Sequence, residues 1–190
     1  EGQRRFKGGS VLVVGCGGDG MNVVQGARLA GASMIIAADL VPAKLAWARG
    51  FGATHAVNAE GAALTSEVLA LTDGVGVDHA FVCIDPPATL LPAFRATAKA
   101  GNVVITALTP DTVTDIKIPP LELFVTQKAI MGAVYGFASP RMQIPDLLRL
   151  YRKGDLKLKE LITRTYALEE INHGYADLEA GKNIRGVVVF

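Results

Sequence analysis

The chain has 190 residues and a net charge of +1, half of its residues are hydrophobic, and 19% are charged. This balance is that of an ordinary globular protein long enough for one sizeable core or a core plus an appendage. The near-neutral charge gives no case for a nucleic-acid partner. No apolar run approaches the roughly 18 residues of a membrane span, and the charged N-terminus lacks a signal-peptide core. We therefore expect a cytoplasmic protein with neither a membrane nor a nucleic-acid partner.

Short apolar runs alternate with helical patterns along the chain. Strands are predicted at residues 11–15, 34–39, 77–84 and 102–108, with weaker candidates at 53–58 and 129–134. Helices are predicted at residues 19–30, 42–49, 64–71 and 88–98. Continuous apolar strands are typical of a parallel sheet covered on both faces, and strand–helix alternation implies right-handed crossovers. The prediction is a doubly wound α/β fold, with a six-stranded parallel sheet and helices on both faces.

Glycines mark the ends of the predicted helices. Gly31, Gly50, Gly74 and Gly101 each follow a helical run. A helix commonly ends on a residue in the left-handed conformation, which glycine adopts most easily. We expect that conformation at all four positions.

The pattern changes after about residue 136. Residues 144–153 and 168–180 look helical, the second closed by Gly181, and residues 184–190 look like a terminal strand. The sequence Ala-Ser-Pro at residues 138–140 is the best candidate boundary. We predict a domain of residues 1–137 followed by a C-terminal αβ tail of residues 138–190.

A glycine-rich turn joins the first strand to the first helix. Residues 15–20 read Gly-Cys-Gly-Gly-Asp-Gly, which fits the G-x-G-x-x-G pattern, with Gly18 inside it. Gly15 would form the tight turn, Gly17 would let the backbone approach a pyrophosphate, and Gly20 would permit close packing of helix on strand. The helix N-terminus supplies amide groups and partial positive charge. In this context the pattern predicts a Rossmann phosphate loop.

The second half of this fingerprint is Asp39, which ends the second predicted strand 19 residues beyond Gly20. A carboxylate there can accept hydrogen bonds from both hydroxyls of the adenosine ribose and would repel a 2′-phosphate. No arginine follows Asp39 immediately. Lys44 lies five residues later, and its positive charge would slightly weaken a strict preference for NAD over NADP. NAD is therefore predicted as the cofactor in preference to NADP.

Asp19 is an unusual member of the loop. A carboxylate in the first helical turn suits the helix dipole, but it faces the pole that should attract the pyrophosphate. The Asp19 carboxylate would then repel the pyrophosphate or accept hydrogen bonds from the amides that should bind it. If the side chain instead points into solvent, it would have little effect. One hypothesis is that Asp19 weakens NAD binding.

The chain offers no metal site of its own. Cys16 and Cys83 lie in separate apolar runs without a CxxC or histidine–cysteine spacing, which favours buried free thiols. The three histidines His55, His79 and His173 have no partner at ligand spacing. We predict no metal ligands and no catalytic residues in this chain.

Several segments together resemble the zinc-type medium-chain alcohol dehydrogenases. They are residues 13–27, 52–58, 168–172 and 181–186, and the resemblance extends over nearly the whole chain. Residues 21–27 are similar to the class III-like and nicotinoprotein-like branch of that family. The resemblance implies the NAD(H)-binding portion of an alcohol/aldehyde oxidoreductase that transfers hydride to NAD.

The resemblance also implies roles for residues outside the loop. With Asp39, the residues Leu40 and Lys44 would line the adenosine pocket, and Ile84 would flank the cleft.

At the nicotinamide end, Leu108 would flank the cleft, and the backbone around Leu108, Ala133 and Tyr135 would bind the carboxamide. Arg185 would reach the pyrophosphate from the tail. From the sequence alone, Arg185 is an isolated cation before an apolar strand, where a surface charge is the more common interpretation.

Family members carry an N-terminal GroES-like domain that supplies the zinc ligands, and its sequence would precede Glu1. Zinc is therefore expected only in the full-length family protein, and this chain alone is expected to bind NAD without zinc catalysis. The tail would pack back on that catalytic domain. The resemblance further implies a homodimer through residues 116–134, an apolar edge that the tail could instead cover within one chain.

Three other functions remain open. A non-catalytic NAD-binding or sensing module would share the same loop. An S-adenosylmethionine methyltransferase also uses a glycine loop and an acid after the second strand, but the alcohol-dehydrogenase-like tail argues against it. A zinc-independent quinone-reductase-like oxidoreductase normally favours NADP, which Asp39 disfavours.

Overall fold

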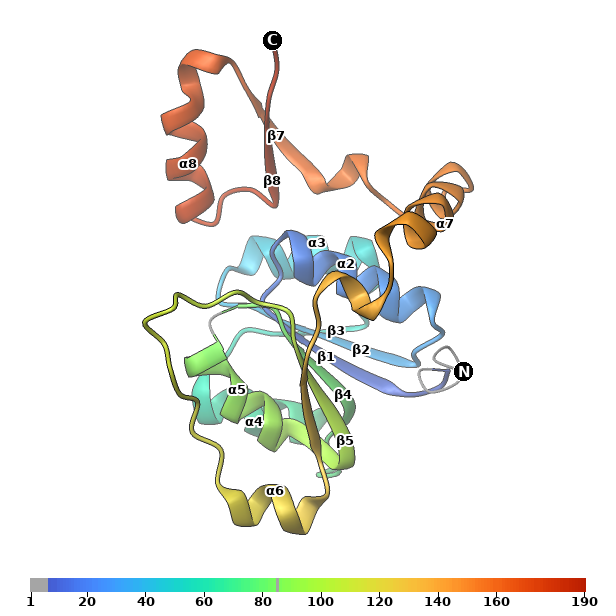
Figure 1. The fold of residues 1–190 in the computed structure, drawn as a ribbon, viewed down its shortest axis with the longest axis vertical. Coiled ribbons are helices and arrows are strands. Elements are labelled where there is room, and N and C mark those ends of the chain that lie inside the picture. The colour runs from blue at the N-terminus through green and yellow to red at the C-terminus, as the bar shows by residue number, and fades with distance from the viewer. Residues whose placement is uncertain (1–6, 85) are drawn as a thin grey trace. The chain divides into compact units, whose positions relative to one another are not determined.

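The computed structural model describes residues 7–84 and 86–190. The chain divides into two compact units, Glu1–Phe137 and Ala138–Phe190 (Figure 1). Among the described residues, no helix has both the length and the apolar character needed to cross a bilayer.

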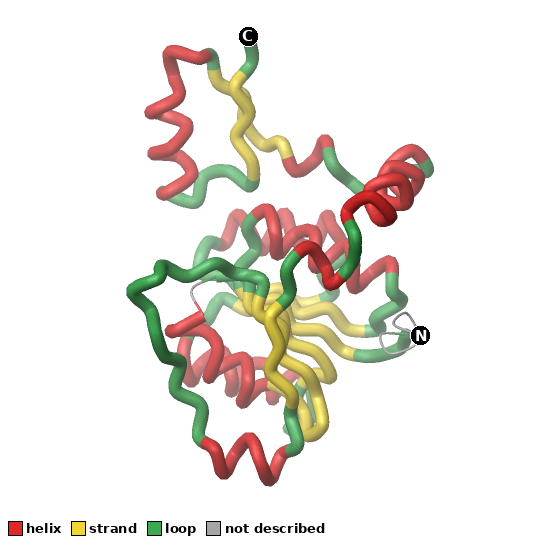
Figure 2. Tube along the Cα trace, in the orientation of Figure 1, coloured by secondary structure: helices red, strands yellow, loops and turns green. Residues whose placement is uncertain are grey.

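The first unit is built on a six-stranded sheet, drawn in yellow in Figure 2. The strands run in the order β3-β2-β1-β4-β5-β6, and every neighbouring pair is parallel. Their bounds are β1 (Ser10–Val14), β2 (Met34–Ala38), β3 (His55–Val57), β4 (Val77–Val82), β5 (Thr97–Ile105) and β6 (Ala129–Gly132). The chain steps outward from β1 to β3 and then crosses back to β4, so the order reverses between β1 and β4. The predicted doubly wound parallel sheet is confirmed.

Helices cover both faces of this sheet, as predicted (Figure 1). One face carries α2 (Gly18–Leu29) and α3 (Pro42–Phe51), and the other carries α4 (Gly61–Leu71), α5 (Pro86–Ala96) and α6 (Pro120–Thr126). Right-handed crossovers require this division, because the connections on either side of the reversal leave from opposite faces. The helix α6 was not expected from the sequence, and an Arg95–Glu122 ion pair of 2.6 Å ties it to α5.

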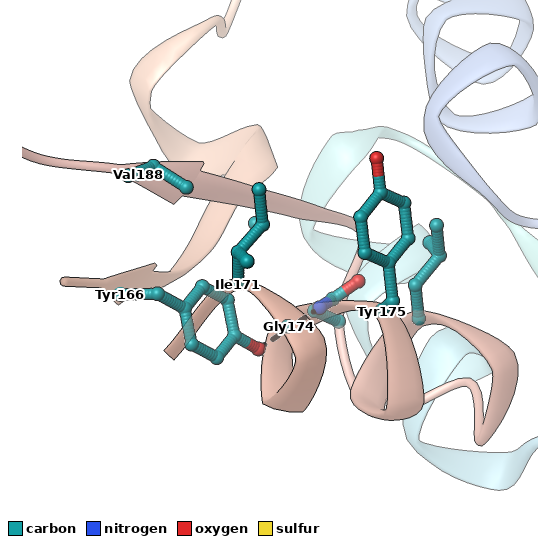
Figure 3. A pocket seen from close by; sticks show the side chains of 8 residues that line it. Tyr166, Ile171, Gly174, Tyr175 and Val188 are labelled. Atoms are coloured by element: carbon teal, nitrogen blue, oxygen red, sulfur yellow. Dashed lines mark hydrogen bonds between the residues drawn. The ribbon is translucent and has the colours of Figure 1, made fainter. Parts of the chain in front are cut away.

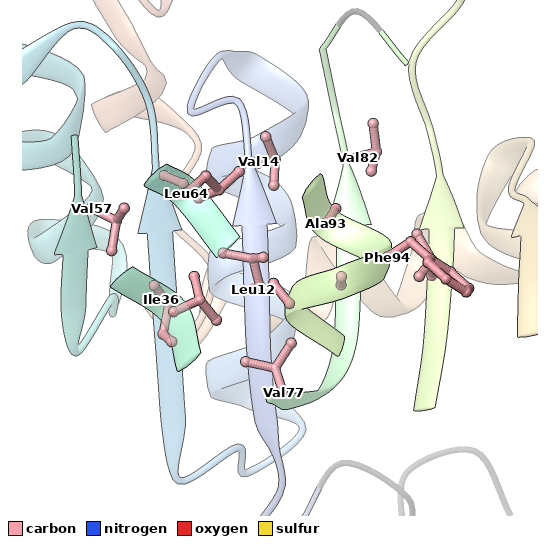
Figure 4. Packing of buried hydrophobic residues seen from close by; sticks show 14 of the residues in the cluster. Leu12, Val14, Ile36, Val57, Leu64, Val77, Val82, Ala93 and Phe94 are labelled. Atoms are coloured by element: carbon pink, nitrogen blue, oxygen red, sulfur yellow. The ribbon is translucent and has the colours of Figure 1, made fainter. Parts of the chain in front are cut away.

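Alternate residues of the strands supply the two buried faces. Leu12 and Val14 of β1 pack with α4 and α5, while Val11 and Val13 lie on the face of α2. Figure 4 shows the first cluster, with Leu12, Val14, Ile36, Val57, Val77 and Val82 of the strands beside Leu64, Ala93 and Phe94 of the helices. Because both faces of β1 and β2 are buried, residues 11–14 and 34–38 are continuously apolar.

Two of the four predicted helix-closing glycines are confirmed, and two are wrong. Gly31 (φ 82°) and Gly74 (φ 80°) adopt the left-handed conformation. Gly50 lies inside α3, which instead closes at Gly52 (φ 120°). Gly101 lies inside β5.

The predicted helix at 88–98 is too long, because β5 begins at Thr97 directly after α5. Between Thr97 and Asn102 the pairing of β5 with β4 shifts, since these residues face Val77 and His79 respectively. The extra residues form a bulge in which Ala100 takes φ 59°. A side chain on Gly101 would meet the carbonyl oxygen of Asp78 at 2.8 Å, so close backbone packing explains this glycine.

The second unit contains α7 (Pro140–Arg152), β7 (Ile162–Tyr166), α8 (Ile171–Glu179) and β8 (Arg185–Val188). The strands β7 and β8 form a parallel two-stranded sheet. The predicted helix at 168–180 is divided into a 3₁₀ turn at Leu168–Glu170 and α8. Further 3₁₀ turns lie at Lys159–Leu161 and, in the first unit, at Tyr135–Phe137. The strand β7 was not predicted.

A buried carboxylate organises the second unit. Asp177 on α8 is 1% exposed and accepts hydrogen bonds from Arg164 Nη1 (2.7 Å) and the Tyr166 hydroxyl (3.0 Å). Lys182 Nζ lies 3.2 Å from its other oxygen, and the Asn183 amide donates to the Tyr166 hydroxyl at 3.1 Å. Burial acts to raise the pKa of Asp177, but the Tyr166 and Lys182 contacts and the Arg164 charge outweigh burial and lower it. The ionised carboxylate thus holds β7, α8 and the turn before β8 together.

Candidate functional site

The candidate site lies at the carboxyl ends of the strands, where their order reverses. In an open parallel sheet the reversal separates the loops that follow two adjacent strands and so leaves a crevice between them. Here those strands are β1 and β4. The loop after β1 runs from Gly15 to Gly17, and α2 begins at Gly18. The amide groups in the first turn of a helix have no preceding turn whose carbonyls could accept their hydrogen bonds. These amides point toward the crevice.

The three motif glycines are required for different reasons. Gly15 has φ 93°, and a Cβ there would lie 2.6 Å from Cγ2 of Ile84. A Cβ on Gly20 would collide with the carbonyl oxygen of Gly15. Gly17, in contrast, is extended (φ −79°, ψ −163°), and a Cβ there would meet no atom of the described residues within 4 Å. The fold itself therefore explains Gly15 and Gly20, whereas the space at Gly17 is open to a ligand.

Asp39 lies against this loop. Its Oδ2 accepts a hydrogen bond from the Cys16 amide at 2.8 Å, and its Oδ1 accepts one from the Val41 amide at 2.9 Å. The Asn58 side chain donates to the Asp39 carbonyl at 2.8 Å. A carboxylate offers about four lone-pair positions, so two remain for an external donor. Asp39 is thus fixed in position with acceptor capacity still available.

Three further predicted residues lie around the loop. Ile84, after β4, is exposed and is the nearest neighbour of a Cβ built on Gly15. Lys44 is half-buried in the first turn of α3, and its charge acts on the Cys16 thiol. Leu40 is exposed directly after β2.

A cleft of about 700 Å³ opens on the sheet face that carries α2. Phe81, Val104 and Met131 are register neighbours on β4, β5 and β6, so their side chains point to the same face and form its floor. Because α2 and α3 follow the β1–β3 half of the sheet, this β4–β6 half is open within the described part of the first unit. The full lining is Asp19, Asn22, Val23, His79, Phe81, Asn102, Val104, Thr106, Met131, Ala133, Tyr135, Gly136 and Phe137.

One end of this cleft meets the carboxyl ends of the strands. Asp19 is in the first turn of α2, Thr106 directly follows β5, and Ala133 directly follows β6. Tyr135 lines the same cleft. The structure thus brings together three predicted residues, Asp19, Ala133 and Tyr135. Thr106 was missed, although the rule that sites form at the carboxyl ends of parallel strands could have found it.

Leu108, predicted at the nicotinamide end, and Arg185, predicted to reach in from the tail, do not line this cleft. Leu108 is 97% exposed and does not line the cleft. Arg185 is the first residue of β8, in the second unit. Their predicted roles at the nicotinamide and the pyrophosphate remain predictions.

Both thiols are poor nucleophiles at neutral pH. Burial, aided by the negative charge of Asp39, raises the pKa of Cys16 to about 12. Burial also raises the pKa of Cys83 to about 11. Both cysteines are free, as predicted; Cys16 is fully buried, whereas Cys83 is only half-buried, so the predicted burial is confirmed for Cys16 alone. Across residues 7–84 and 86–190, no group of three or more histidine, cysteine, aspartate or glutamate side chains is placed to hold a metal ion.

A smaller pocket of about 200 Å³ lies within the second unit (Figure 3). Tyr166, Ile171, Tyr175 and Val188 give it mostly apolar walls. Among the described atoms, the buried Oδ1 of Asn183 finds no hydrogen-bond partner. No residue proposed from the sequence for cofactor binding lines this pocket.

The glycines of the loop predict contrasting stabilities. Gly20→Ala should lower the free energy of unfolding of the first unit by at least about 2 kcal/mol, because its Cβ meets backbone that cannot move away. Gly17→Ala should change it by less than about 0.5 kcal/mol. Urea unfolding followed by circular dichroism measures both. Gly26→Ala, also on α2 with open space around its Cβ, is the matched control. Equal destabilisation by the Gly17 and Gly20 variants would contradict this account.

The thiols should resist alkylation in the folded chain. At pH 8 we expect iodoacetamide to label Cys16 and Cys83 at least about a hundredfold more slowly in buffer than in concentrated urea, because only the thiolate reacts and burial suppresses it. Intact-mass time courses under the two conditions measure this ratio. Rapid labelling of the native chain would show that at least one thiol is accessible and ionised.

Comparison with known proteins identifies the family. A sequence profile described as "Zinc-binding dehydrogenase" matches residues 18–153. Putative alcohol dehydrogenase D of Mycobacterium tuberculosis is 40% identical over 184 residues, which cover 96% of this chain and 50% of that protein. NDMA-dependent alcohol dehydrogenase of Amycolatopsis methanolica is 41% identical over 185 residues, which cover 96% and 49% respectively.

Solved structures agree with the sequence matches. The alcohol dehydrogenase zinc-binding domain protein of Burkholderia ambifaria superposes with a TM-score of 0.89 at 32% identity, over 99% of this chain and 50% of the other. The chain therefore spans about half the length of the curated relatives that it matches. The resemblance to zinc-type alcohol dehydrogenases is confirmed, since the matched profile extends over most of the sequence: the chain belongs to the zinc-binding dehydrogenase family.

Proposed function

We propose that this chain is the NAD(H)-binding portion of an alcohol dehydrogenase. The observation that carries the proposal is the open space at Gly17, next to the anchored carboxylate of Asp39. Packing within the described residues does not explain why Gly17 is a glycine. A glycine at the start of a helix would, however, let a phosphate approach the backbone closely. The family relationship and the names of the relatives support the same function.

The residues present fit a dinucleotide in extended form. Gly17 and the first turn of α2 would hold the pyrophosphate, and Asp39 would accept from the adenosine ribose. The remaining acceptor positions on Asp39 suit the ribose hydroxyls, whereas a 2′-phosphate would meet a carboxylate. The cleft beside β4, β5 and β6 would take the nicotinamide half. When bound, the nicotinamide supplies the hydride acceptor or donor, and this chain supplies orientation.

The second unit would complete a larger protein. Its sheet has only two strands, and Tyr175, Leu178 and Val189 are exposed. A two-stranded sheet with exposed apolar side chains is marginal alone, so we propose that it packs on the other half of the family fold. That half would also provide the zinc site. The chain by itself should then bind NAD(H) without oxidising alcohols.

Nucleotide titrations test this function. We expect NADH fluorescence to rise on binding, and NADPH to bind at least about tenfold more weakly because of charge repulsion at Asp39. Gly17→Ala should fold normally yet weaken NADH binding at least about tenfold, while Gly26→Ala should leave it unchanged.

Three results would count against the proposal. They are the absence of NADH binding, equal affinity for NADH and NADPH, and full affinity in the Gly17→Ala variant. Zinc-dependent alcohol oxidation by the chain alone would contradict the assignment of zinc chemistry to another part of the protein.

We also propose that two copies associate through β6. In the described sheet this strand is one of the two outer strands, the other being β3, and β5 lies on its inner side. Exposed apolar side chains surround it, namely Leu121, Phe124, Val125 and Val134. An outer strand with apolar neighbours offers backbone groups and contact area to a second copy. Pairing of β6 with β6 would extend one sheet across a two-fold axis.

Charge at this edge should break the dimer. Val134 is 72% exposed, and Val134→Lys would bring two like charges together across the axis. We expect the dimer dissociation constant to rise at least about tenfold, measured by sedimentation velocity. Val75→Lys, at a position 68% exposed in the turn before β4, is the control and should change nothing. A monomeric wild-type chain at micromolar concentration would refute the dimer.

A further inference from the structure

We infer that Asp19 is a specificity-determining residue that biases the bound coenzyme toward its oxidised form, NAD⁺. The inference rests on the proposed function, since it assumes that a nicotinamide dinucleotide occupies the crevice. It goes further by assigning to this side chain a preference between the two redox forms of the coenzyme.

The first step is the place of Asp19 in the fold. A dinucleotide on a doubly wound sheet spans two halves, and the acid after the second strand marks the adenosine half. Asp39 therefore assigns β1–β3 to adenosine, which leaves the β4–β6 half for the nicotinamide. Asp19 lines the cleft of that second half together with Thr106, Ala133 and Tyr135. Although it belongs to the phosphate loop in sequence, its side chain lies on the nicotinamide side.

A second observation places the Asp19 charge at the same end. Cys83 directly follows β4, and burial is the main cause of its raised pKa. The hydrogen bond with Thr106 acts in the opposite direction, and the negative charge of Asp19 adds to the effect of burial. The Asp19 carboxylate thus acts electrostatically on the carboxyl end of β4, next to the cleft. Asp39 lies elsewhere, bound to the amides of Cys16 and Val41.

The two forms of the coenzyme differ in charge at one ring. The oxidised nicotinamide ring is a cation, and the dihydronicotinamide ring is neutral, while adenosine and pyrophosphate are the same in both. A fixed carboxylate near the ring therefore attracts NAD⁺ more than NADH. Repulsion of the pyrophosphate by Asp19 affects both forms equally, so it cancels in the ratio of their affinities.

The expected size follows from Coulomb's law. Two unit charges about 8 Å apart near a protein surface, at an effective dielectric constant of about 20 to 40, interact strongly enough to change an equilibrium constant about fivefold or more. We expect Asp19 to shift the ratio of the NADH and NAD⁺ dissociation constants by about three- to tenfold. For a two-electron couple this equals a change of about 15 to 30 mV in the potential of the bound coenzyme.

The experiment measures three ligands by calorimetry: NAD⁺, NADH and ADP-ribose, which has the pyrophosphate but no nicotinamide. In Asp19→Asn, which keeps the shape and removes the charge, the ratio of the NADH to the NAD⁺ dissociation constant should fall about three- to tenfold. Asp19→Glu should retain the wild-type ratio. Glu67→Gln, which removes one exposed carboxylate from α4, is the matched control and should leave the ratio unchanged.

Each outcome decides a separate point. If all three ligands bind and Asp19→Asn changes their affinities by one common factor, Asp19 acts on the pyrophosphate alone and the inference is overturned. If the ratio does not change, the inference is also overturned, while the proposed function stands. If the wild-type chain binds none of the three ligands, the proposed function fails and the inference fails with it.

Discussion

The carboxylate of Asp39 connects two turns on which the whole candidate site depends. One oxygen accepts the Cys16 amide after β1, and the other accepts the Val41 amide after β2. Backbone amides that are shielded from water need an acceptor, and in these two turns the acceptor is a side chain. The Asp39 carboxylate therefore supports the fold of both turns before any ligand binds. In the proposed binding mode the same group selects NAD, so a substitution that relaxes cofactor preference also removes support from the phosphate loop.

Close packing imposes the second constraint. Gly20 must approach the carbonyl of Gly15, and Gly15 must turn next to Ile84, so α2 leaves β1 in one direction only. That direction brings Asp19 and Asn22 to the rim of the cleft over β4, β5 and β6. The reversal of strand order sets the crevice, and the glycines set how the helix borders it. Neither part alone would place Asp19 at the cleft over β4, β5 and β6.

The sequence predicts best those strands that are buried on both faces, because burial makes their sequences almost continuously apolar. The strands β1 and β2 are covered on both faces, so every residue except Ser10 at the start of β1 is apolar and the pattern is clear. The strand β7 (Ile162–Tyr166) is mostly exposed and carries threonine and arginine, so its sequence lacks the continuous apolar run that identifies a buried strand. The bulge in β5 depends on contact between Gly101 and Asp78, two residues far apart in sequence. No local pattern contains such a contact.

The site follows the same division. Gly15, Gly17, Gly20 and Asp39 could be predicted because their spacing reflects one local strand–helix–strand unit. Thr106 and Ala133 join Asp19 only through the pairing of β1 with β4, of β4 with β5 and of β5 with β6, which brings together residues distant in sequence. The family resemblance places Leu108 at the nicotinamide end of the cleft; in the structure this residue is exposed after β5, and its role there remains a prediction. Residues assembled by long-range pairing are the ones that spacing alone misses.

The two acidic residues of the candidate site, Asp39 and Asp19, would respond to different features of a bound coenzyme. In the proposed binding mode Asp39 contacts the adenosine half of the coenzyme, which has the same charge in both redox forms. Asp39 would therefore select NAD over NADP but would not distinguish the oxidised coenzyme from the reduced one. Asp19 lines the cleft that we propose for the nicotinamide ring, whose charge changes. Asp19 lies in the first turn of α2, where the partial positive charge of the helix would offset its repulsion of a pyrophosphate. In the proposed binding mode the helix that begins there would thus allow a carboxylate inside the phosphate loop, and the redox preference would follow from the place of the Asp19 side chain at the cleft over β4, β5 and β6.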